Sequence, residues 1–374
     1  MKKPVVIFIA NRGYALTSSR TGLIRRFLEN GWQVVLATAD DEESRSLCEV
    51  GAYLEKLDID RGGLSFLADV RAFRRLSDIF NKWSPVLVHQ FHAKPVIFGS
   101  IAAKRCLGNI RVVNTITGLG HAFVTGGVAA RLAGMGYKYA LPKANMTIFQ
   151  NSDDQALFLC KNWISEEKSC LVPGSGVDLQ RFQMTDRMSY DLSRPKIIML
   201  GRLLGQKGVR EFSEVATRIR LKWPQARFLW AGEEDSVHPD AIAAEWFKSQ
   251  SAVEYLGRLD DVVPILKQAD MLLFTSYYRE GVPRVILEAA ATGLPTVGFD
   301  VPGVREAVLQ DQTGCLVPQG DLDSMTESVA QLLKSKDMRV QMGKAARSMI
   351  EEKFDIQFIQ ERYVQIYRDL GIDI

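Results

Sequence analysis

Residues 280–297 read Glu280-Gly-Val-Pro-Arg-Val-Ile-Leu-Glu288-Ala-Ala-Ala-Thr-Gly-Leu-Pro-Thr-Val297. The apolar run Met271 to Thr275, just before this stretch, suits a buried strand. Val285 to Ala291 favours a helix, which Gly293-Leu-Pro295 ends. Pro283 suits the first turn of that helix, because its missing N–H costs nothing there. The stretch therefore predicts a strand–loop–helix junction, the repeating unit of a parallel α/β sheet.

The chemistry of this junction indicates a site for a sugar nucleotide. The N–H groups around Gly281 and Val282 lie at a predicted helix N-terminus, which attracts phosphate. Glu280 stands beside that phosphate site, and Glu288 lies roughly 10 Å further along the helix axis. One carboxylate can then reach a sugar on one side of a diphosphate, and the other a ribose on the other side. The alternative is that both are solvated helix residues, as most glutamates are.

Strand and helix patterns alternate along the whole chain, which predicts two doubly wound parallel sheets. The expected strands of the first half are 5–10, 34–38, 86–89, 112–115 and 147–150, with helices at 21–30 and 66–83. Those of the second half are 196–200, 227–231, 253–256, 271–275, 296–299 and 315–317, with a final helix at 354–370. The polar stretch 181–194 suggests a linker. We therefore expect Rossmann-like domains at 1–190 and 191–354.

Length and charge add further expectations. A chain of 374 residues is too long for one ordinary core, which supports two domains. Residues 1–190 hold 24 Lys/Arg and 17 Asp/Glu, whereas residues 191–374 hold 23 and 27. A basic first half suits an anionic partner, although random drift of surface charge explains it equally well. The apolar runs are short for a transmembrane helix, and we expect a cytoplasmic protein.

Two loops of the second half carry further candidate residues. Arg202 and Lys207 lie in Gly201-Arg-Leu-Leu-Gly-Gln-Lys-Gly208, between a strand and a helix, and can converge on one diphosphate. The segment 253–260 contains Gly257, Arg258 and Leu259 and resembles the segment whose backbone reads the nucleobase in family 4 of the retaining glycosyltransferases. The resemblance implies that these three residues lie beside the base.

In the first half, candidate residues follow the predicted strands. Arg12 and Gly13 can approach the donor phosphates or the acceptor, and Arg20 either pairs with an acceptor phosphate or is solvated. His89 and His92 have a spacing that can bind a metal, but no third ligand is near in the sequence. We therefore expect no metal site and interpret these histidines as core or cleft residues.

Several motifs resemble those of family 4 of the retaining glycosyltransferases, which have the GT-B fold. Glu280-Gly-x-Pro, Leu287-Glu288-Ala and Gly293-x-Pro295 resemble the family signature. Lys94-Pro95, residues 114–120 with Phe123, and residues 172–178 with Phe182 resemble a branch that builds bacterial capsule, O-antigen or exopolysaccharide. The resemblance extends over nearly the whole chain.

The resemblance implies two Rossmann-like domains facing a cleft, with the terminal helix 355–374 crossing back to the acceptor-binding first domain. It also implies a UDP-sugar as donor substrate, no cofactor, and a polyprenyl-diphosphate-linked sugar as acceptor at the inner face of a bacterial membrane. In this scheme Arg202 and Lys207 stabilise the leaving diphosphate without a metal. Glu280 orients the sugar, Glu288 holds the ribose, and Lys94 belongs to the acceptor-binding domain.

One motif departs from the family pattern. Many members carry His-Gly where this chain has Thr117-Gly118, and that histidine contacts the transferred sugar. Here His121 lies four residues further on. A threonine hydroxyl can bond a sugar but is no base near neutral pH, so the role of Thr117 or His121 stays open.

Three other functions are compatible with parts of this sequence. A UDP-sugar 2-epimerase has the same architecture, a glycosidase would use the two glutamates as its carboxyl pair, and a non-catalytic binder would use the basic half. Interleaved aromatic residues expected for nucleic acid are lacking.

The basic segments 71–82 and 129–143 predict contact with an anionic membrane surface, unless their apolar residues are ordinary core.

Overall fold

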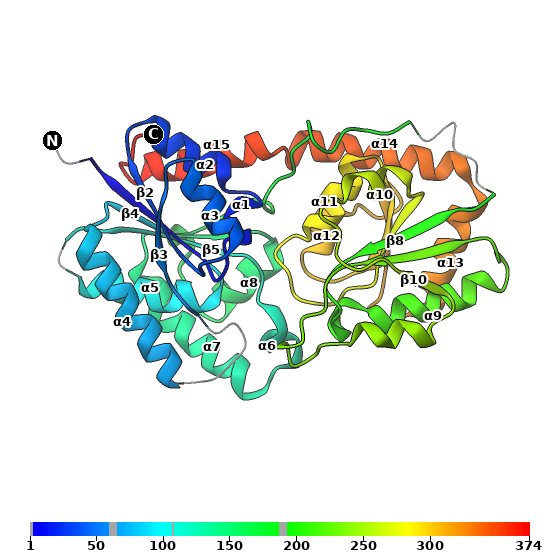
Figure 1. Ribbon diagram of the computed structural model, residues 1–374, viewed down its shortest axis with the longest axis horizontal. Helices are drawn as coiled ribbons and strands as arrows, with labels where there is room; N and C mark the ends of the chain where they lie inside the picture. The colour runs from blue at the N-terminus through cyan, green and yellow to red at the C-terminus, as the bar shows by residue number, and fades with distance from the viewer. Residues whose placement is uncertain (1–2, 60–65, 107, 187–192) are drawn as a thin grey trace. The chain divides into compact units, whose positions relative to one another are not determined.

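The computed structural model describes residues 3–59, 66–106, 108–186 and 193–374, and these form two compact units (Figure 1). Unit 1 comprises Met1–Ser175 with Ile356–Ile374, and unit 2 comprises Gly176–Asp355. Each unit is a parallel sheet with helices on both faces, so the predicted doubly wound α/β fold class is confirmed.

Unit 1 holds a seven-stranded parallel sheet in the order β3-β2-β1-β4-β5-β6-β7. Its strands are β1 Val5–Ile9, β2 Gln33–Thr38, β3 Tyr53–Lys56, β4 Leu87–Phe91, β5 Arg111–Ile116, β6 Met146–Phe149 and β7 Ser169–Leu171. Its helices are α1 Tyr14–Thr17, α2 Thr21–Glu29, α3 Glu42–Glu49, α4 Phe66–Trp83, α5 Ala93–Arg105, α6 Gly120–Thr125, α7 Gly127–Ala140, α8 Ser152–Cys160 and α15 Ile356–Asp369, with short 3-10 turns η1 Leu141–Lys143 and η2 Glu166–Lys168.

Unit 2 repeats this plan with six parallel strands in the order β10-β9-β8-β11-β12-β13. The strands are β8 Lys196–Leu200, β9 Arg227–Ala231, β10 Val253–Tyr255, β11 Met271–Phe274, β12 Thr296–Phe299 and β13 Gly314–Val317. The helices are α9 Val209–Arg220, α10 Val263–Gln268, α11 Arg284–Ala291, α12 Val304–Ala307, α13 Leu322–Lys334 and α14 Lys336–Lys353, with 3-10 turns η3 Gly205–Lys207 and η4 Ala244–Ser249.

The central strands are buried on both faces, because helices cover each side of the sheets. In β1 all five residues are buried, and in β11 all four are. Such strands read as continuous apolar runs rather than alternating ones. In unit 1, α2 and α15 pack on one face of the sheet and α4 and α5 on the other.

The chain passes into unit 2 at Ser175–Gly176 rather than at the expected position 190. The reason is that Val177 and Phe182 are buried in the core of unit 2. Part of the expected linker, 187–192, lies outside the described residues. The final helix α15 begins at Ile356 and belongs to unit 1, where its Tyr363 and Tyr367 join the core.

The edge strands β3 and β7 had no counterpart among the sequence predictions. Both are short, and in each at least one side chain is exposed, so they lack the apolar run of a central strand. No helix of the described chain combines the length and the apolar character needed to cross a bilayer.

Candidate active site

The carboxyl ends of β8 and β11 carry the loops with the strongest sequence predictions. These strands are neighbours in the sheet, and the chain leaves β8 toward β9 on one side and returns as β11 on the other. Such a reversal of strand order opens a crevice where parallel α/β sheets bind ligands. Arg202 and Lys207 follow β8, and Glu280 follows β11, so the fold brings all three to this point.

The loop between β8 and α9 is bonded to the loop after β11. Tyr277 and Tyr278 both donate their N–H groups to the Gln206 carbonyl at 3.0 Å. Gly208 has a φ of 78°, and a Cβ at this position would lie 2.1 Å from the Thr275 carbonyl oxygen. Only glycine fits such a close approach in a left-handed conformation. The two loops are therefore held as one backbone surface.

Arg202 and Lys207 are both held by carboxylates. Arg202 pairs with Asp235, which follows β9 and is itself buried, and Lys207 pairs with Glu280. Burial and the charge of Arg202 lower the pKa of Lys207 to about 7, whereas contact with the Glu280 carboxylate favours its protonated form. The two cations predicted to bind a diphosphate are thus close together, and in this structure each has a carboxylate partner.

Glu288 is a buried residue of α11, so its interpretation as a solvated glutamate is wrong. Its exposed fraction is 8%, and it accepts a bond from Arg284 at 2.9 Å. Burial raises the pKa of the Glu288 carboxyl, while the charges of Arg284 and Arg181 oppose that shift. A buried, paired carboxylate at the fifth residue of α11 is suited to accept hydrogen bonds from a hydroxyl pair such as that of a ribose.

The start of α11 differs from the sequence prediction by one position. Pro283 is the N-cap residue rather than part of the first turn, and the helix begins at Arg284. The N–H of Ile286 donates to the Pro283 carbonyl at 3.1 Å. Gly281 and Val282 lie directly before this N-terminus, and Val282 is buried. The helix still directs its first-turn N–H groups toward the loop, as phosphate binding requires.

The predicted base-binding residues follow β10 at the same edge of the sheet. The Gly257 carbonyl accepts from the Gly232 N–H at 2.8 Å, which joins this segment to the loop after β9. Arg258 lies 3.5 Å from Glu233 in an exposed ion pair, and Leu259 packs against the core of unit 2. Backbone groups of this segment are therefore positioned by the neighbouring loop.

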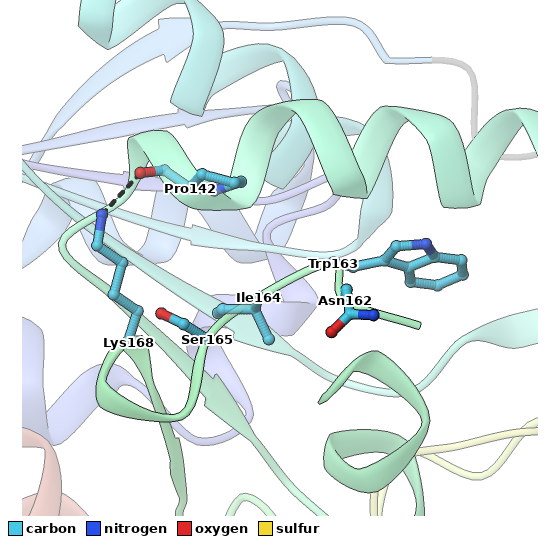
Figure 2. A pocket seen from close by; sticks show the side chains of 6 residues that line it. All are labelled: Pro142, Asn162, Trp163, Ile164, Ser165 and Lys168. Carbon is cyan, nitrogen blue, oxygen red and sulfur yellow. Dashed lines mark hydrogen bonds between the residues drawn. The ribbon is translucent and has the colours of Figure 1, made fainter. Parts of the chain in front are cut away.

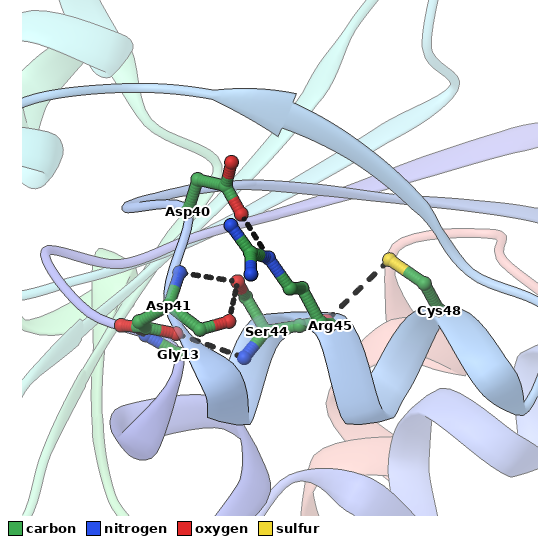
Figure 3. A network of polar contacts seen from close by, with 6 residues as sticks. All are labelled: Gly13, Asp40, Asp41, Ser44, Arg45 and Cys48. Atoms are coloured by element: carbon green, nitrogen blue, oxygen red, sulfur yellow. Dashed lines mark hydrogen bonds and ion pairs between the residues drawn. The ribbon is translucent and has the colours of Figure 1, made fainter.

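In unit 1 the loop after β1 is held by the N-terminus of α3 (Figure 3). The N–H of Gly13 donates to Asp41 Oδ2 at 2.9 Å, and Asp41 also caps α3 by accepting from the Ser44 N–H. A Cβ on Gly13 would lie 2.2 Å from Asp41 Oδ1, which explains the need for glycine here. Arg12, the preceding residue, is carried on this fixed turn and is exposed.

The other predicted residues of unit 1 follow β4 and β5, the next strands along from β1. Lys94, in the first turn of α5, pairs with Asp69 of α4 at 2.7 Å. Thr117 and Gly118 follow β5 directly, and His121 lies in α6, immediately after them. Since β1, β4 and β5 are parallel neighbours, all of these residues share one edge of the sheet.

His89 and Arg20 of unit 1 are both buried. His89 is fully buried, with Nδ1 2.5 Å from the Tyr367 hydroxyl and Nε2 2.8 Å from Thr115 Oγ1, as the core interpretation predicts. Arg20 has an exposed fraction of 2%, so its interpretation as a solvated residue is wrong. Its guanidinium lies 4.7 Å from the centre of the Phe91 ring and 5.5 Å from that of Tyr363.

Three acidic residues that contact the site were missed by sequence reasoning. Asp235 holds Arg202, Asp41 holds the Gly13 turn, and Asp69 holds Lys94. The sequence around a single acidic residue does not show which distant residue it pairs with. The signal that was available for Asp235 is its position just after a predicted strand, next to Glu233 and Glu234.

A pocket of about 410 Å³ in unit 1 contains none of the predicted site residues (Figure 2). It lies beside the short turn η1 and is lined by Trp163, Ile164 and Lys168 among others. Lys168 Nζ donates to the Pro142 carbonyl at 2.7 Å, so the ammonium group that lines this pocket already has a hydrogen-bond partner within the protein.

The two units match two different family descriptions. Residues 5–151 match the family described as "Glycosyl transferase 4-like", and residues 194–335 match "Glycosyl transferases group 1". Together these ranges include β1 to β6 and all strands of unit 2, and therefore both strand-end edges described above.

Two curated relatives match over most of their length. The chain is 26% identical to the N,N'-diacetylbacillosaminyl-diphospho-undecaprenol alpha-1,3-N-acetylgalactosaminyltransferase of Campylobacter jejuni, over 96% of this chain and 97% of that one. It is 25% identical to the UDP-Gal:alpha-D-GlcNAc-diphosphoundecaprenol alpha-1,3-galactosyltransferase of Escherichia coli, over 83% and 82%. A solved structure of Anabaena HepE in complex with UDP-glucose has a similar fold, with a TM-score of 0.76 at 17% identity over 98% and 99% of the two chains.

Proposed function

Because the chain belongs to the family 4 glycosyltransferases, we propose that it transfers a hexose or N-acetylhexosamine from a UDP-sugar to a saccharide on a polyprenyl diphosphate. Transfer proceeds with retention of the anomeric configuration, as the family resemblance implies. The Campylobacter and Escherichia relatives act on sugars linked to diphosphoundecaprenol, and the name of the second includes UDP-Gal as donor. The observation that carries the proposal is the Arg202, Lys207 and Glu280 group at the switch point of unit 2.

Departure of UDP is the step that this group assists. As the bond between the sugar and the β-phosphate breaks, negative charge grows on the diphosphate. Arg202 offers a planar fork and Lys207 a compact ammonium, and both stand at a helix N-terminal edge that favours anions. Preorganised charges of this kind stabilise the transition state without reorganisation at the moment of reaction.

When the donor binds, Glu280 and Glu288 contact different parts of it. Lys207 turns from Glu280 to the diphosphate, which leaves Glu280 to accept bonds from hydroxyls of the transferred sugar. Glu288 remains in its buried pair with Arg284 and accepts from the ribose. The acceptor hydroxyl attacks from the side of the leaving group, and a phosphate oxygen takes its proton. No separate base is then required, in keeping with Thr117 in place of the family histidine.

We propose that no metal ion takes part, because Arg202 and Lys207 supply the positive charge that a divalent cation supplies elsewhere. Activity should therefore persist in EDTA and should not rise on addition of magnesium or manganese. Loss of activity in EDTA, restored by either ion, would show that the charge assignment is wrong. No other cofactor is part of the proposal, and the UDP-sugar is a substrate.

The experiment that tests the function measures UDP release with a panel of UDP-sugars, with and without an extracted lipid-linked acceptor. The proposal expects UDP release that depends on acceptor and a product with the donor's anomeric configuration. A 2-epimer formed from the donor without acceptor would identify an epimerase instead. Tight binding of UDP with no turnover on any acceptor would identify a non-catalytic binder.

We also propose that the enzyme works at the inner face of the bacterial cytoplasmic membrane, where polyprenyl-diphosphate saccharides are extended. The basic first half of the chain supports an anionic membrane surface as partner rather than nucleic acid. Fractionation of cells should then recover part of the enzyme with membranes at low salt and release it at high salt.

A further inference from the structure

Helix α7 presents a row of large apolar side chains to solvent. Val128, Leu132, Met135 and Tyr139 have exposed fractions of 68%, 50%, 68% and 57%. The core-facing side of the same helix is formed by Gly134, Tyr137 and Ala140, which are buried. The apolar content of α7 is therefore divided between a core face and an outer face.

The four exposed residues form one continuous stripe. Their spacings of four, three and four residues place them within about 60° of one another on a helix with 3.6 residues per turn. At 1.5 Å per residue the stripe is about 16 Å long. An exposed apolar stripe of this length is a binding surface or a liability, since soluble proteins seldom leave such patches without a partner.

The charges around the stripe are all positive on this part of the chain. Arg131 and Lys138 are exposed on α7 beside the stripe, and Lys143 Nζ lies 3.4 Å from the centre of the Tyr139 ring. From Ile79 to Ser152 the sequence contains eight Lys/Arg and no Asp or Glu. Basic side chains beside apolar ones are suited to a surface with an apolar interior and anionic headgroups. Lys143 Nζ donates to the Tyr139 carbonyl at 2.5 Å, which keeps its charge at the end of the stripe.

Helix α4 provides the internal contrast, since it is equally basic in sequence but has no such stripe among its residues 67–83. Its apolar residues Leu76, Ile79 and Phe80 are buried in the core. Its Arg75 and Lys82 pair with Glu55 of β3 at 2.7 and 2.6 Å. The apolar residues Leu76, Ile79 and Phe80 of α4 are therefore ordinary core residues. Of the two segments predicted to contact a membrane, the outer face of α7 remains as the candidate surface.

We propose that the outer face of α7 docks the protein on an anionic lipid surface, with the apolar stripe inserted between headgroups and Arg131, Lys138 and Lys143 bound to them. The proposal rests on the proposed function, because the acceptor there is carried by a lipid. It also gives the docking a purpose. Helix α6 and the Thr117-Gly118 turn directly precede α7 in the chain, so docking brings this strand-end edge of unit 1 to the headgroup layer.

The test is co-sedimentation of the full chain with vesicles of phosphatidylcholine alone or with phosphatidylglycerol added. Wild type should bind only the anionic vesicles, and binding should weaken as salt rises. Changing Val128, Leu132, Met135 and Tyr139 together to Ser should weaken binding at least about tenfold. Changing Arg131, Lys138 and Lys143 together to Ser should weaken it on the order of a hundredfold at low salt, from about a fivefold contribution of each charge.

A control replaces two apolar residues of unit 2 that are more exposed than the stripe, Leu221 and Val237 at 81% and 82%, with Ser. This control should bind vesicles as wild type does, and all variants should keep the wild-type melting temperature and UDP affinity. Equal loss in the control and the stripe variant, or wild type that ignores anionic vesicles, would overturn the proposal. So would self-association in solution that the stripe variant abolishes while its vesicle binding is unchanged.

The two proposals fail in different ways. If the stripe variant transfers sugar normally to a detergent-dispersed acceptor but poorly to the same acceptor in vesicles, docking by α7 is supported. If wild type binds anionic vesicles through α7 but transfers sugar to no polyprenyl-linked acceptor, the docking surface stands and the proposed function does not.

Discussion

Arg20 and Lys207 occupy corresponding places in the two units. Each stands at the N-terminal end of the long helix that follows the strand at the switch point, α2 after β1 and α9 after β8. Both are buried. Lys207 meets the carboxylate of Glu280, which follows the neighbouring strand β11, whereas Arg20 meets the ring of Phe91, the last residue of the neighbouring strand β4.

The same position in the two units therefore holds cations with different partners, a carboxylate for Lys207 and aromatic rings for Arg20. A cation held by a carboxylate at a strand end can exchange that partner for an anionic substrate. A cation covered by two aromatic rings has its charge stabilised in place, and no carboxylate is bonded to Arg20 among the residues described. We therefore propose that Lys207 binds substrate, whereas Arg20 belongs to the internal packing of α2 and α15.

The largest effects should come from the cations of unit 2. Arg202→Ala or Lys207→Ala should lower kcat by roughly 10²–10³, the loss typical for one electrostatic stabiliser. The control is Arg227→Ala, which breaks an ion pair with Glu254 at the opposite end of the same sheet. Steady-state kinetics should show near wild-type turnover in this control. If Arg202→Ala and Lys207→Ala turn over equally well, the switch point of unit 2 is not the donor site.

The two glutamates should differ in the step that they affect. Glu288→Gln should weaken UDP binding by about 1.5–3 kcal/mol, the value of a hydrogen bond to a charged group, or roughly ten- to a hundredfold in Kd. Glu280→Gln should mainly lower turnover, because in the proposed function Glu280 accepts hydrogen bonds from hydroxyls of the transferred sugar. Calorimetric titration with UDP and single-turnover rates separate the two. Unchanged UDP affinity in Glu288→Gln would remove its assignment to the ribose, and unchanged turnover in Glu280→Gln its assignment to the sugar.

The pKa of Lys207 predicts a smaller, pH-dependent effect. With a pKa lowered to about 7 by burial and Arg202, the ammonium is charged below that pH and loses its proton above it. UDP affinity should thus fall as pH rises, by at most about tenfold per pH unit for one proton. Glu280 favours the charged form, so Glu280→Gln should move this fall to lower pH.

The measurement is UDP affinity between about pH 6.5 and 9, above the second phosphate pKa of about 6. Lys207→Arg, whose guanidinium stays protonated throughout, serves as the control and should show a flat profile in this range. A profile for wild type that is as flat as that of Lys207→Arg would show that Lys207 remains charged and does not set the pH dependence.

The smallest effect is expected for Arg20. Replacing Arg20 by an apolar residue of similar volume removes the desolvation cost of a buried charge, and no bonded carboxylate among the described residues is left without its partner. Arg20→Met should therefore keep UDP affinity and transferase activity, with a melting temperature equal to or above that of wild type. A loss of activity at unchanged stability, seen as a raised KM for the lipid-linked acceptor, would instead make Arg20 an anion-binding residue like Lys207.

The sequence by itself determined the two doubly wound sheets and most of the loops that bear the candidate residues. Strands such as Lys196–Leu200 and Thr296–Phe299 and the helix Phe66–Trp83 end where the pattern predicts. Their apolar runs and their glycine and proline boundaries depend on residues within a few positions of one another. The short edge strand Tyr53–Lys56 escaped prediction because a mixed polar sequence carries no comparable local signal.

Only the tertiary structure decided what the charged and apolar side chains contact. Arg202 meets Asp235 across 33 positions of sequence, and Arg20 is buried because α15 returns from the far end of the chain to place Tyr363 over it. The basic helices α4 and α7 look alike in sequence, yet one buries its apolar residues and the other exposes a stripe of them. Such contacts arise when loops close between distant segments, and pairing energies of this kind leave no periodic trace in the sequence.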